Sequence, residues 1–200
     1  MILPTVDDIR ALHEKHAPTP EAFELVYTHC EIVWKIAEQL LSADGHRLDL
    51  DADLTRAGAL LHDIGVYRLY DNTGRLRTED YIRHGVLGHA ILREEGFPEQ
   101  LCRFCSCHTG VGLTRHDIER QNLPLPVADY VAETAEEQLV MYADKFHTKT
   151  TPPAFLSFDT YAAQIGRFGE EKASAFHTLR TRFGEPTLAP LTTQYGHTPA

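Results

Sequence analysis

The 200-residue sequence predicts a single all-α domain. Apolar residues recur every three or four positions in most segments, whereas the apolar-polar alternation typical of half-buried strands is absent. Signals that start and stop helices also recur along the chain. We therefore expect one helical domain over 1–183, with its core at about 20–150, additional C-terminal helices over 155–183 and a tail over 184–200.

The helix boundaries follow from local residue types, taken in chain order. Thr19, Pro20 and Glu21 give the usual order of N-cap, proline and acidic first turn, and Gly96 is a typical residue just past a helix end. Further on, Thr134 and Glu137 form a capping-box pattern. The predicted helices cover 20–41, 52–64, 80–95, 98–108, 114–121, 134–147, 158–167 and 170–183. Polar, glycine-rich or proline-rich segments separate them at 43–51, 67–78, 122–130 and 148–153.

Charge and hydropathy argue against two classes of protein, those that bind long nucleic acid and those that span a membrane. The formal net charge of -10 argues against a surface that holds long nucleic acid, because basic stripes carry that binding. No apolar run approaches the roughly 20 residues that span a bilayer, and the N-terminal segment is acidic where a signal peptide is basic. We therefore expect a cytoplasmic protein that binds neither long nucleic acid nor a membrane. A small anionic substrate stays compatible with this charge if metal ions supply local positive charge.

The most informative feature is the pair His62-Asp63 at the end of a predicted apolar helix. Together the two side chains offer one nitrogen and one or two oxygens to a divalent cation. Adjacent residues diverge on a regular helix, but the geometry relaxes where the helix ends, and we assign that end to Gly65. The alternative interpretation is a capping histidine followed by a solvent-facing aspartate.

Further candidate ligands lie on the inward faces of other predicted helices. His29 shares the apolar stripe of its helix, and Asp144 joins the apolar face of another, where an aspartate without a cation or donor is unfavourable. His84 lies beside two glycines, and His108 ends its helix next to a Thr-Gly-Val-Gly segment. His29 could instead be a hydrogen-bonded core residue. Four imidazoles and two carboxylates are too many for one tetrahedral site but suit two metal ions that share a carboxylate.

The cysteines give a weaker signal. Cys102, Cys105 and Cys107 cluster in one short segment, but Cys30 stands alone, whereas a structural zinc site normally needs a second ligand pair. Cys102 and Cys105 fall on one helical face, so we interpret these residues as buried thiols rather than as a zinc site.

The ordered set of ligands resembles the HD-domain metal-dependent phosphohydrolases, and more narrowly their HDIG subgroup. The resemblance extends from about Tyr27 to Thr150 and includes His-Asp-Ile-Gly at 62–65, Arg-His-Gly-Val-Leu-Gly-His at 83–89, His-Thr-Gly-Val-Gly at 108–112 and Ala-Asp-Lys at 143–145. It implies an HD-domain helical bundle and a metal-dependent hydrolysis of a small phosphoester or phosphoanhydride, with a nucleotide as the expected substrate.

The resemblance also implies roles for individual residues. His29, His62, Asp63 and Asp144 match the four-ligand core, and His84 and His108 match the additional ligands of binuclear members. Asp63, His84 and His108 are the candidate catalytic residues. The expected cofactors are two divalent ions, iron or manganese first, with zinc, nickel, cobalt or magnesium as alternatives. Arg83, Lys145 and Lys149 are candidates for binding substrate phosphate, with a solvated surface position as the alternative for each.

Several alternatives remain open at this point. His89 competes with His84 but stands where the pattern usually has a small residue, and Val66 replaces a lysine that is common in relatives. The same ligands hold two irons in oxygenases of the superfamily, so a di-iron oxygenase is the second hypothesis. A nucleotide-sensing protein without turnover is the third. A homodimer is compatible with the resemblance.

Overall fold

The computed structural model describes residues 2–42 and 50–200 and confirms the all-α class. The predicted loop at 43–51 falls largely on residues 43–49, outside the described part. The α-helices are α1 (Val6–His16), α2 (Pro20–Leu41), α3 (Ala52–Leu61), α4 (His84–Glu94), α5 (Glu99–Ser106), α6 (Arg115–Gln121), α7 (Ala135–Asp144), α8 (Phe158–Ile165), α9 (Glu170–Phe183) and α10 (Ala189–Tyr195). The 3-10 helices are η1 (Ile64–Leu69), η2 (Thr78–Arg83) and η3 (Gly166–Phe168). The strands are β1 (His147–Thr148), β2 (Ala154–Phe155) and β3 (Thr198–Pro199).

Local capping explains where the main helices begin. The Thr19 side chain accepts a hydrogen bond from the Ala22 backbone at the start of α2, with Pro20 in the first turn. Thr134 and Glu137 form both halves of the predicted capping box at the start of α7. The unpaired backbone N–H groups at these helix starts are thereby satisfied, which fixes the N-terminal ends of two helices that reach the centre of the molecule.

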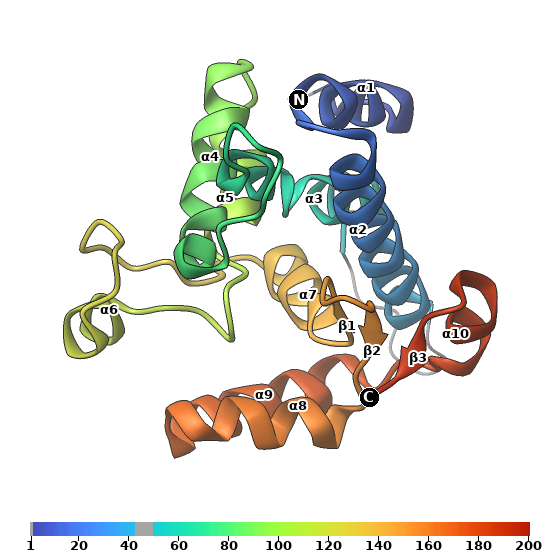
Figure 1. Ribbon diagram of the computed structural model, residues 1–200. Coiled ribbons are helices and arrows are strands. Elements are labelled where there is room, and N and C mark those ends of the chain that lie inside the picture. Colours follow the sequence, from blue (N-terminus) through green and yellow to red (C-terminus); the bar gives the residue numbers. More distant parts are fainter. Residues whose placement is uncertain (1, 43–49) are drawn as a thin grey trace.

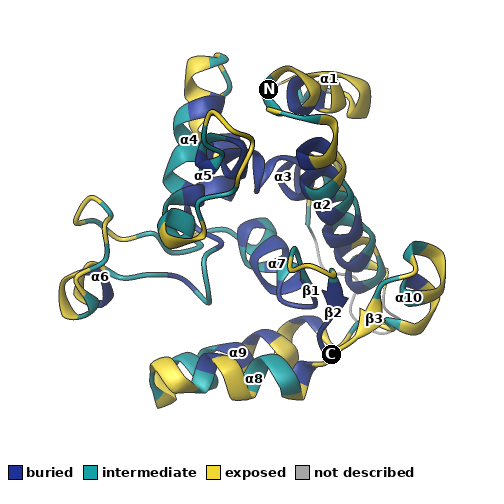
Figure 2. Cartoon of the chain, viewed as in Figure 1, coloured by how far each residue is buried: buried dark blue, intermediate teal, exposed yellow. Residues whose placement is uncertain are grey.

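The helices pack around a common centre. α2, α3 and α7 contact one another, α4 and α5 form a second packed pair beside α3, and α8 and α9 lie side by side below α7 (Figure 1). The faces turned inward are buried, whereas the outer turns of α1, α8, α9 and α10 are exposed (Figure 2). No helix among the described residues has the length and apolar character needed to cross a bilayer.

The structure differs from the predicted elements in three places. The helix expected over 52–64 ends at Leu61, and the one expected over 80–95 is divided into η2 and α4. The helix expected over 134–147 ends at Asp144, and the chain continues into β1, which pairs antiparallel with β2, while β2 pairs parallel with β3. Strands of two residues are too short to produce a recognisable alternation, which explains why the sequence does not predict this sheet.

Two further α-helices, α1 and α10, lie outside the predicted set, and α10 forms within the segment 184–200 that was predicted as a tail. The sequence signal is clear for α1. Thr5 and Asp8 form a capping box at its start, and Ile9 and Leu12 bury its apolar side. The signal is present in the sequence, so this helix could have been predicted from the same rules.

Candidate metal centre

The helix that carries the His-Asp pair ends earlier than predicted, and this ending directs both side chains at one point. His62 keeps helical backbone angles as the C-cap of α3, and Asp63 has φ -109° and ψ 9° before η1 begins. Neighbouring side chains on a regular helix diverge by about 100°, whereas here His62 Nε2 lies 3.4 Å from Asp63 Oδ2. Both residues are fully buried.

The glycine after the pair has a different role from the one predicted. Gly65 is not among the residues with positive φ, so it does not act as a left-handed helix cap. A Cβ atom at Gly65 would lie 2.0 Å from the His84 carbonyl oxygen and 2.2 Å from the Gly88 backbone nitrogen. The missing side chain therefore allows η1 to contact α4, and this contact brings His84 towards Asp63.

One oxygen of Asp63 faces a first group of ligand atoms that come from separate helices. His29 Nε2, from α2, lies 3.3 Å from Asp63 Oδ2 and 3.0 Å from Asp144 Oδ1, at the end of α7. His62 Nε2 lies 3.5 Å from the same Asp144 oxygen. The structure therefore brings together the four residues of the predicted core set, with their ligand atoms within 4.8 Å of one another.

The other oxygen of Asp63 faces a second group. His84 Nε2 lies 3.6 Å and His108 Nε2 3.5 Å from Asp63 Oδ1, and the two imidazole nitrogens are 2.9 Å apart. His89, the rival of His84, lies elsewhere, with Nδ1 3.1 Å from Ser106 Oγ and Nε2 3.3 Å from Glu99. Asp63 is thus the residue shared by both groups.

Backbone carbonyls orient three of the four histidines. The Nδ1 atoms of His62, His84 and His108 donate to the carbonyl oxygens of Ala59, Tyr81 and Phe104, at 2.7, 2.6 and 3.0 Å. A ring nitrogen that faces a carbonyl oxygen carries a proton, so Nε2 is the nitrogen of each ring that faces the cluster and can bind a metal ion. This geometry leaves His84 and His108 no second free nitrogen, which favours a ligand role over proton transfer.

Three buried atoms at the centre lack hydrogen-bond partners: His62 Nε2, Asp63 Oδ1 and Asp63 Oδ2. Unpaired polar atoms are costly in a protein interior, especially on a charged carboxylate. Lys149 Nζ makes an ion-pair contact with Asp63 Oδ2, which offsets part of the charge. The set of nitrogen and oxygen donors fits divalent metal ions, which would supply the missing partners.

Two of the imidazoles are in the form that binds metal, whereas His62 must first lose a proton. Burial lowers the pKa of His84 to about 3 and also lowers the pKa of His108, so both rings are in the neutral, metal-binding form. Burial would also lower the pKa of His62, but Asp63 beside it outweighs burial and raises that pKa well above its usual value, so a metal ion there displaces a proton. Burial alone would raise the pKa of each carboxyl group. Lys149 and His62 beside Asp63, and Lys145 beside Asp144, outweigh it and hold both carboxyl pKa values well below their usual range.

The two predicted lysines have different surroundings. Lys145 is buried and donates to the His108 carbonyl oxygen at 2.8 Å and to Asp144 Oδ2 at 2.6 Å. It therefore links a residue of each ligand group and has its donors directed into the protein. Lys149 reaches Asp63 from the cavity wall, while Arg83 is not among the residues that line the cavities beside the cluster.

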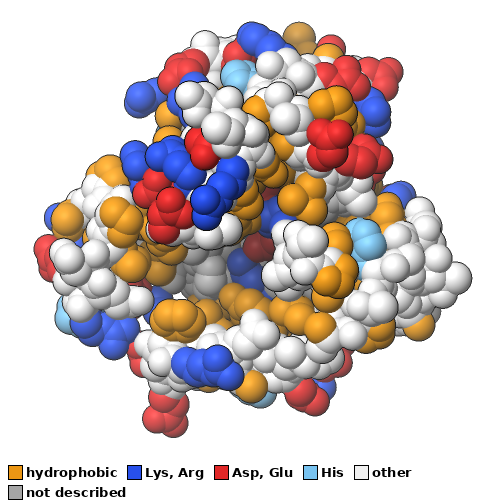
Figure 3. Space-filling model, viewed as in Figure 1, with side chains coloured by type: hydrophobic (Ala, Val, Ile, Leu, Met, Phe, Trp, Pro, Cys, Tyr) orange, Lys and Arg blue, Asp and Glu red, His pale blue; other side chains and the backbone are white. Residues whose placement is uncertain are grey.

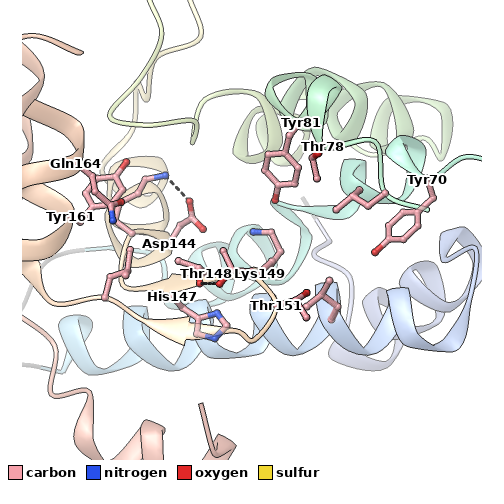
Figure 4. A pocket seen from close by; sticks show the side chains of 15 residues that line it. Tyr70, Thr78, Tyr81, Asp144, His147, Thr148, Lys149, Thr151, Tyr161 and Gln164 are labelled. Carbon is pink, nitrogen blue, oxygen red and sulfur yellow. Dashed lines mark hydrogen bonds and ion pairs between the residues drawn. The ribbon is translucent and has the colours of Figure 1, made fainter. Parts of the chain in front are cut away.

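A cavity of about 590 Å³ opens beside the cluster, next to a smaller one of about 250 Å³ that reaches His84 and His108. Figure 3 shows the molecule hollowed at its centre, with charged side chains deep in the hollow and hydrophobic ones around it. Tyr81 and Lys149 point towards each other inside the larger cavity, and Tyr161 lies across from them on α8 (Figure 4). Asp144, Lys145 and Lys149 border both cavities, so the cluster is accessible to a small molecule.

Some residues at this site were not predicted from the sequence. Tyr70, Tyr81 and Tyr161 line the larger cavity, and His147 Nδ1 lies 2.9 Å from His29 Nδ1. A tyrosine on a partly apolar helix face looks like a core residue in sequence, and only the position of His147 three residues after Asp144 gives a local signal. The four cysteines are buried free thiols, as predicted.

Comparisons with known proteins relate most of this chain to one family. Residues 26–149 match the model of the HD domain family. An uncharacterised protein of Methanocaldococcus jannaschii is 41% identical over 129 residues, which are 63% of this chain and 69% of that protein. A tRNA (cytidine(56)-2'-O)-methyltransferase of Picrophilus torridus is 38% identical over 123 residues, 62% of this chain. The chain spans only 31% of that methyltransferase, so the activity in its name concerns a much longer protein.

Solved structures share the fold. The HD domain of the L. monocytogenes phosphodiesterase PgpH superposes with a TM-score of 0.52 and 16% sequence identity, covering 94% of this chain and 98% of that one. The same domain in complex with cyclic-di-AMP also gives a TM-score of 0.52, with 94% and 96% coverage. At this identity the similarity establishes the arrangement of helices alone.

Proposed function

The chain belongs to the HD domain family, and from this membership we propose that it is a metal-dependent phosphohydrolase of the HDIG subgroup. We propose a small phosphoester or phosphoanhydride as the substrate, specifically a nucleotide. The observation that carries the proposal is Asp63, whose two buried oxygens face two separate groups of imidazoles. One carboxylate shared in this way suits a site that would hold two metal ions. The proposed ligands are His29, His62, Asp63 and Asp144 for one ion and Asp63, His84 and His108 for the other.

Two divalent cations, iron or manganese in our proposal, would supply Lewis-acid activation of the phosphoryl group and of a water nucleophile. The protein's own contribution is to hold the ligands in place before the substrate arrives. The carbonyls of Ala59, Tyr81 and Phe104 fix three imidazoles, and Lys145 fixes the Asp144 carboxylate. Such pre-organised groups lower the barrier because they need little rearrangement during the reaction.

The residues that line the cavity favour a substrate with few phosphate groups and an aromatic or apolar part. Lys149 borders both cavities and is the proposed phosphate-binding cation, because the donors of Lys145 are directed to Asp144 and His108. Leu25, Tyr70 and Leu76 line the larger cavity, where an aromatic base could stack or pack. The PgpH domain in complex with cyclic-di-AMP shows that this fold accommodates a nucleotide in another protein.

The test combines metal analysis with assays of phosphate release. Protein purified without chelator or nickel affinity should contain up to two divalent ions per chain and should hydrolyse at least one of nucleoside monophosphates, dinucleoside polyphosphates or cyclic dinucleotides. Asp63→Asn keeps the side-chain shape and removes the shared charge, so metal content and activity should fall together, with activity below about 1% of the parent, a loss of about 3 kcal/mol in transition-state stabilisation. Asp53→Asn, on the exposed first turn of α3, is the matched control.

Two outcomes would contradict the proposal. A metal-loaded protein that releases no phosphate from any of these compounds, but consumes oxygen when it contains iron, would indicate the oxygenase chemistry instead. Full metal content in the Asp63→Asn variant would show that the ions bind elsewhere in the molecule.

A further inference from the structure

A row of three histidines connects the proposed metal site to the C-terminal strand. His29 Nδ1 lies 2.9 Å from His147 Nδ1, and His147 Nε2 lies 2.9 Å from His197 Nδ1. The rings are stacked, with centroids 5.2 Å and 5.1 Å apart and interplanar angles of 28° and 20°. His29 and His147 are buried, and the partly exposed His197 places the end of the row near solvent.

His29 differs in this respect from the other three proposed imidazole ligands. His62, His84 and His108 each donate Nδ1–H to a backbone carbonyl three or four residues earlier in the chain. His29 Nδ1 instead faces a side chain that lies 118 positions away in the sequence. A histidine that binds a metal ion through Nε2 must carry its proton on Nδ1 and needs an acceptor for it. For His29 that acceptor is His147.

We propose that His147, held in place by His197, is a positioning residue that orients His29 for a metal ion, so that the C-terminal strand β3 is part of the support of the metal centre. This inference rests on the proposed metal site and adds a residue that the ligand pattern does not contain. A neutral imidazole has one donor and one acceptor nitrogen. If His147 Nδ1 accepts the hydrogen bond from His29, then His147 Nε2 carries a proton and donates it to His197 Nδ1. Both nitrogens of His147 and the inner nitrogen of His197 then have a hydrogen-bond partner.

The small sheet explains how the row is held. His147 begins β1 and pairs with Phe155 of β2, whose ring lies 4.9 Å from the His147 ring at an angle of 61°. β3 pairs with β2, and the Ala200 backbone N–H donates to the Phe155 carbonyl oxygen at 2.8 Å. These contacts place His197 beside His147. The short sheet thus holds His147 and His197 in contact.

Two substitutions at His147 separate hydrogen bonding from packing. His147→Asn keeps an acceptor, because Oδ1 of asparagine occupies the position of Nδ1, but it removes the stacked ring. His147→Phe keeps the stacked ring and removes the acceptor. We expect the Phe variant to bind Mn²⁺ at the first site 10- to 100-fold more weakly, the range found for lost outer partners of metal ligands, and the Asn variant to stay near the parent affinity.

The measurement is Mn²⁺ titration of the full chain, carried out in parent protein and in a His84→Ala background where the second group is dismantled. Thermal unfolding in the presence of a chelator reports folding separately from metal affinity. If the Phe variant does not fold, His147→Leu, which also lacks the acceptor, replaces it. His116→Phe on the exposed side of α6 is the matched control for a histidine-to-phenylalanine change.

The outcomes distinguish this inference from the proposed function. A parent protein that binds no Mn²⁺ or other divalent ion would overturn both. Parent-like affinity in the Phe and Leu variants, or equal weakening in the Phe and Asn variants, would overturn the positioning role and leave the metal site intact. His197→Phe should weaken Mn²⁺ binding less than His147→Phe, and a larger effect at His197 would also contradict the proposal.

Discussion

At the scale of single residues, different contacts separate two lysines that look equivalent in the sequence. Lys145 and Lys149 follow Asp144 closely, and both were predicted to bind phosphate. Lys145 has its ammonium between Asp144 and the His108 carbonyl, whereas Lys149 points into the cavity towards Asp63 and Tyr81. The first lysine therefore holds the ligands together, and the second is the one that can meet a substrate.

This difference predicts opposite behaviour of the two methionine variants. Lys145→Met leaves the buried Asp144 without its cation, so the free energy of unfolding should fall by about 3 kcal/mol and metal content should decrease. In the metal-loaded protein, where the ions supply positive charge to Asp63, Lys149→Met should fold normally and lose about 10- to 100-fold in kcat/KM, the value of a charge-assisted hydrogen bond to phosphate. Its metal affinity should stay equal or rise, because the ammonium no longer contacts Asp63.

Urea unfolding, metal analysis and steady-state kinetics on the two proteins check this prediction. Lys35→Met, in an exposed ion pair on α2, is the control for the loss of a lysine. A Lys149→Met variant that loses its metal while keeping its fold would show that this lysine supports the centre instead of the substrate.

At the scale of helices and strands, the start of each element was easier to predict than its end. Thr19 and Thr134 mark helix starts through local hydrogen bonds, which neighbouring residues determine. The early end of α3 and the break between η2 and α4 depend on the contact of Gly65 with Gly88, which joins segments distant in sequence. Local patterns therefore identified Gly65 as important, but they predicted a helix cap, whereas the structure shows a close contact with α4.

Because η1 approaches α4 closely at Gly65, a side chain added at this position should disturb both segments. Gly65→Ala places a Cβ atom against the backbone of α4, which cannot move without displacing His84. We expect a loss of at least about 3 kcal/mol in the free energy of unfolding, at the upper end of overpacking effects, together with weaker binding at the second metal group. At Gly166 the nearest atom to an added Cβ is 3.7 Å away, so Gly166→Ala is the control and should unfold like the parent.

The segment that contains α6 is attached to the rest of the chain by a small number of polar contacts. Lys172 on α9 donates to Asp117 Oδ2 at 2.6 Å and to the Gly112 carbonyl oxygen at 2.8 Å, and both side chains are largely buried. Burial raises the pKa of Asp117, but the hydrogen bonds from Lys172 and Thr114 outweigh it and hold the pKa well below its usual value.

The pKa of Asp117 is lower in the folded protein than in the unfolded chain, so the ionised carboxylate stabilises the folded protein at pH values above the unfolded pKa of about 3.9. This stabilisation is lost as the pH falls towards the lower folded pKa. Asp117→Asn should therefore cost about 2 kcal/mol between pH 5 and 8, and the difference from the parent should shrink below about pH 4. Urea unfolding at several pH values measures it, with the exposed Asp159→Asn as control. A difference that grows on acidification would contradict the assignment.

At the scale of the whole molecule, the sequence predicted which residues meet but not the space around them. His29, His62, Asp63, His84, His108 and Asp144 carry a recognisable order, and the inward faces of their helices are visible as apolar stripes. The cavity arises where η2, the 148–151 segment and α8 come together, and no single segment encodes it. The contact of His147 with His197 likewise depends on a parallel pairing between β2 and β3 that has no local signature.

The same centre joins most of the helices, so metal binding should stabilise the entire domain. Side chains from or beside α2, α3, α4, α5 and α7 meet there, and Lys149 is the cation that contacts the buried Asp63 carboxylate. An ion that binds only the folded chain adds about 2.7 kcal/mol at a free concentration 100 times its Kd. For a chain of this length, that corresponds to roughly 5–10 °C in Tm. Calorimetry with Mn²⁺ and with a chelator should show this difference in the parent and little of it in Asp63→Asn. An equal Tm in both conditions for a parent protein that binds the ion would mean that the ion does not connect these helices.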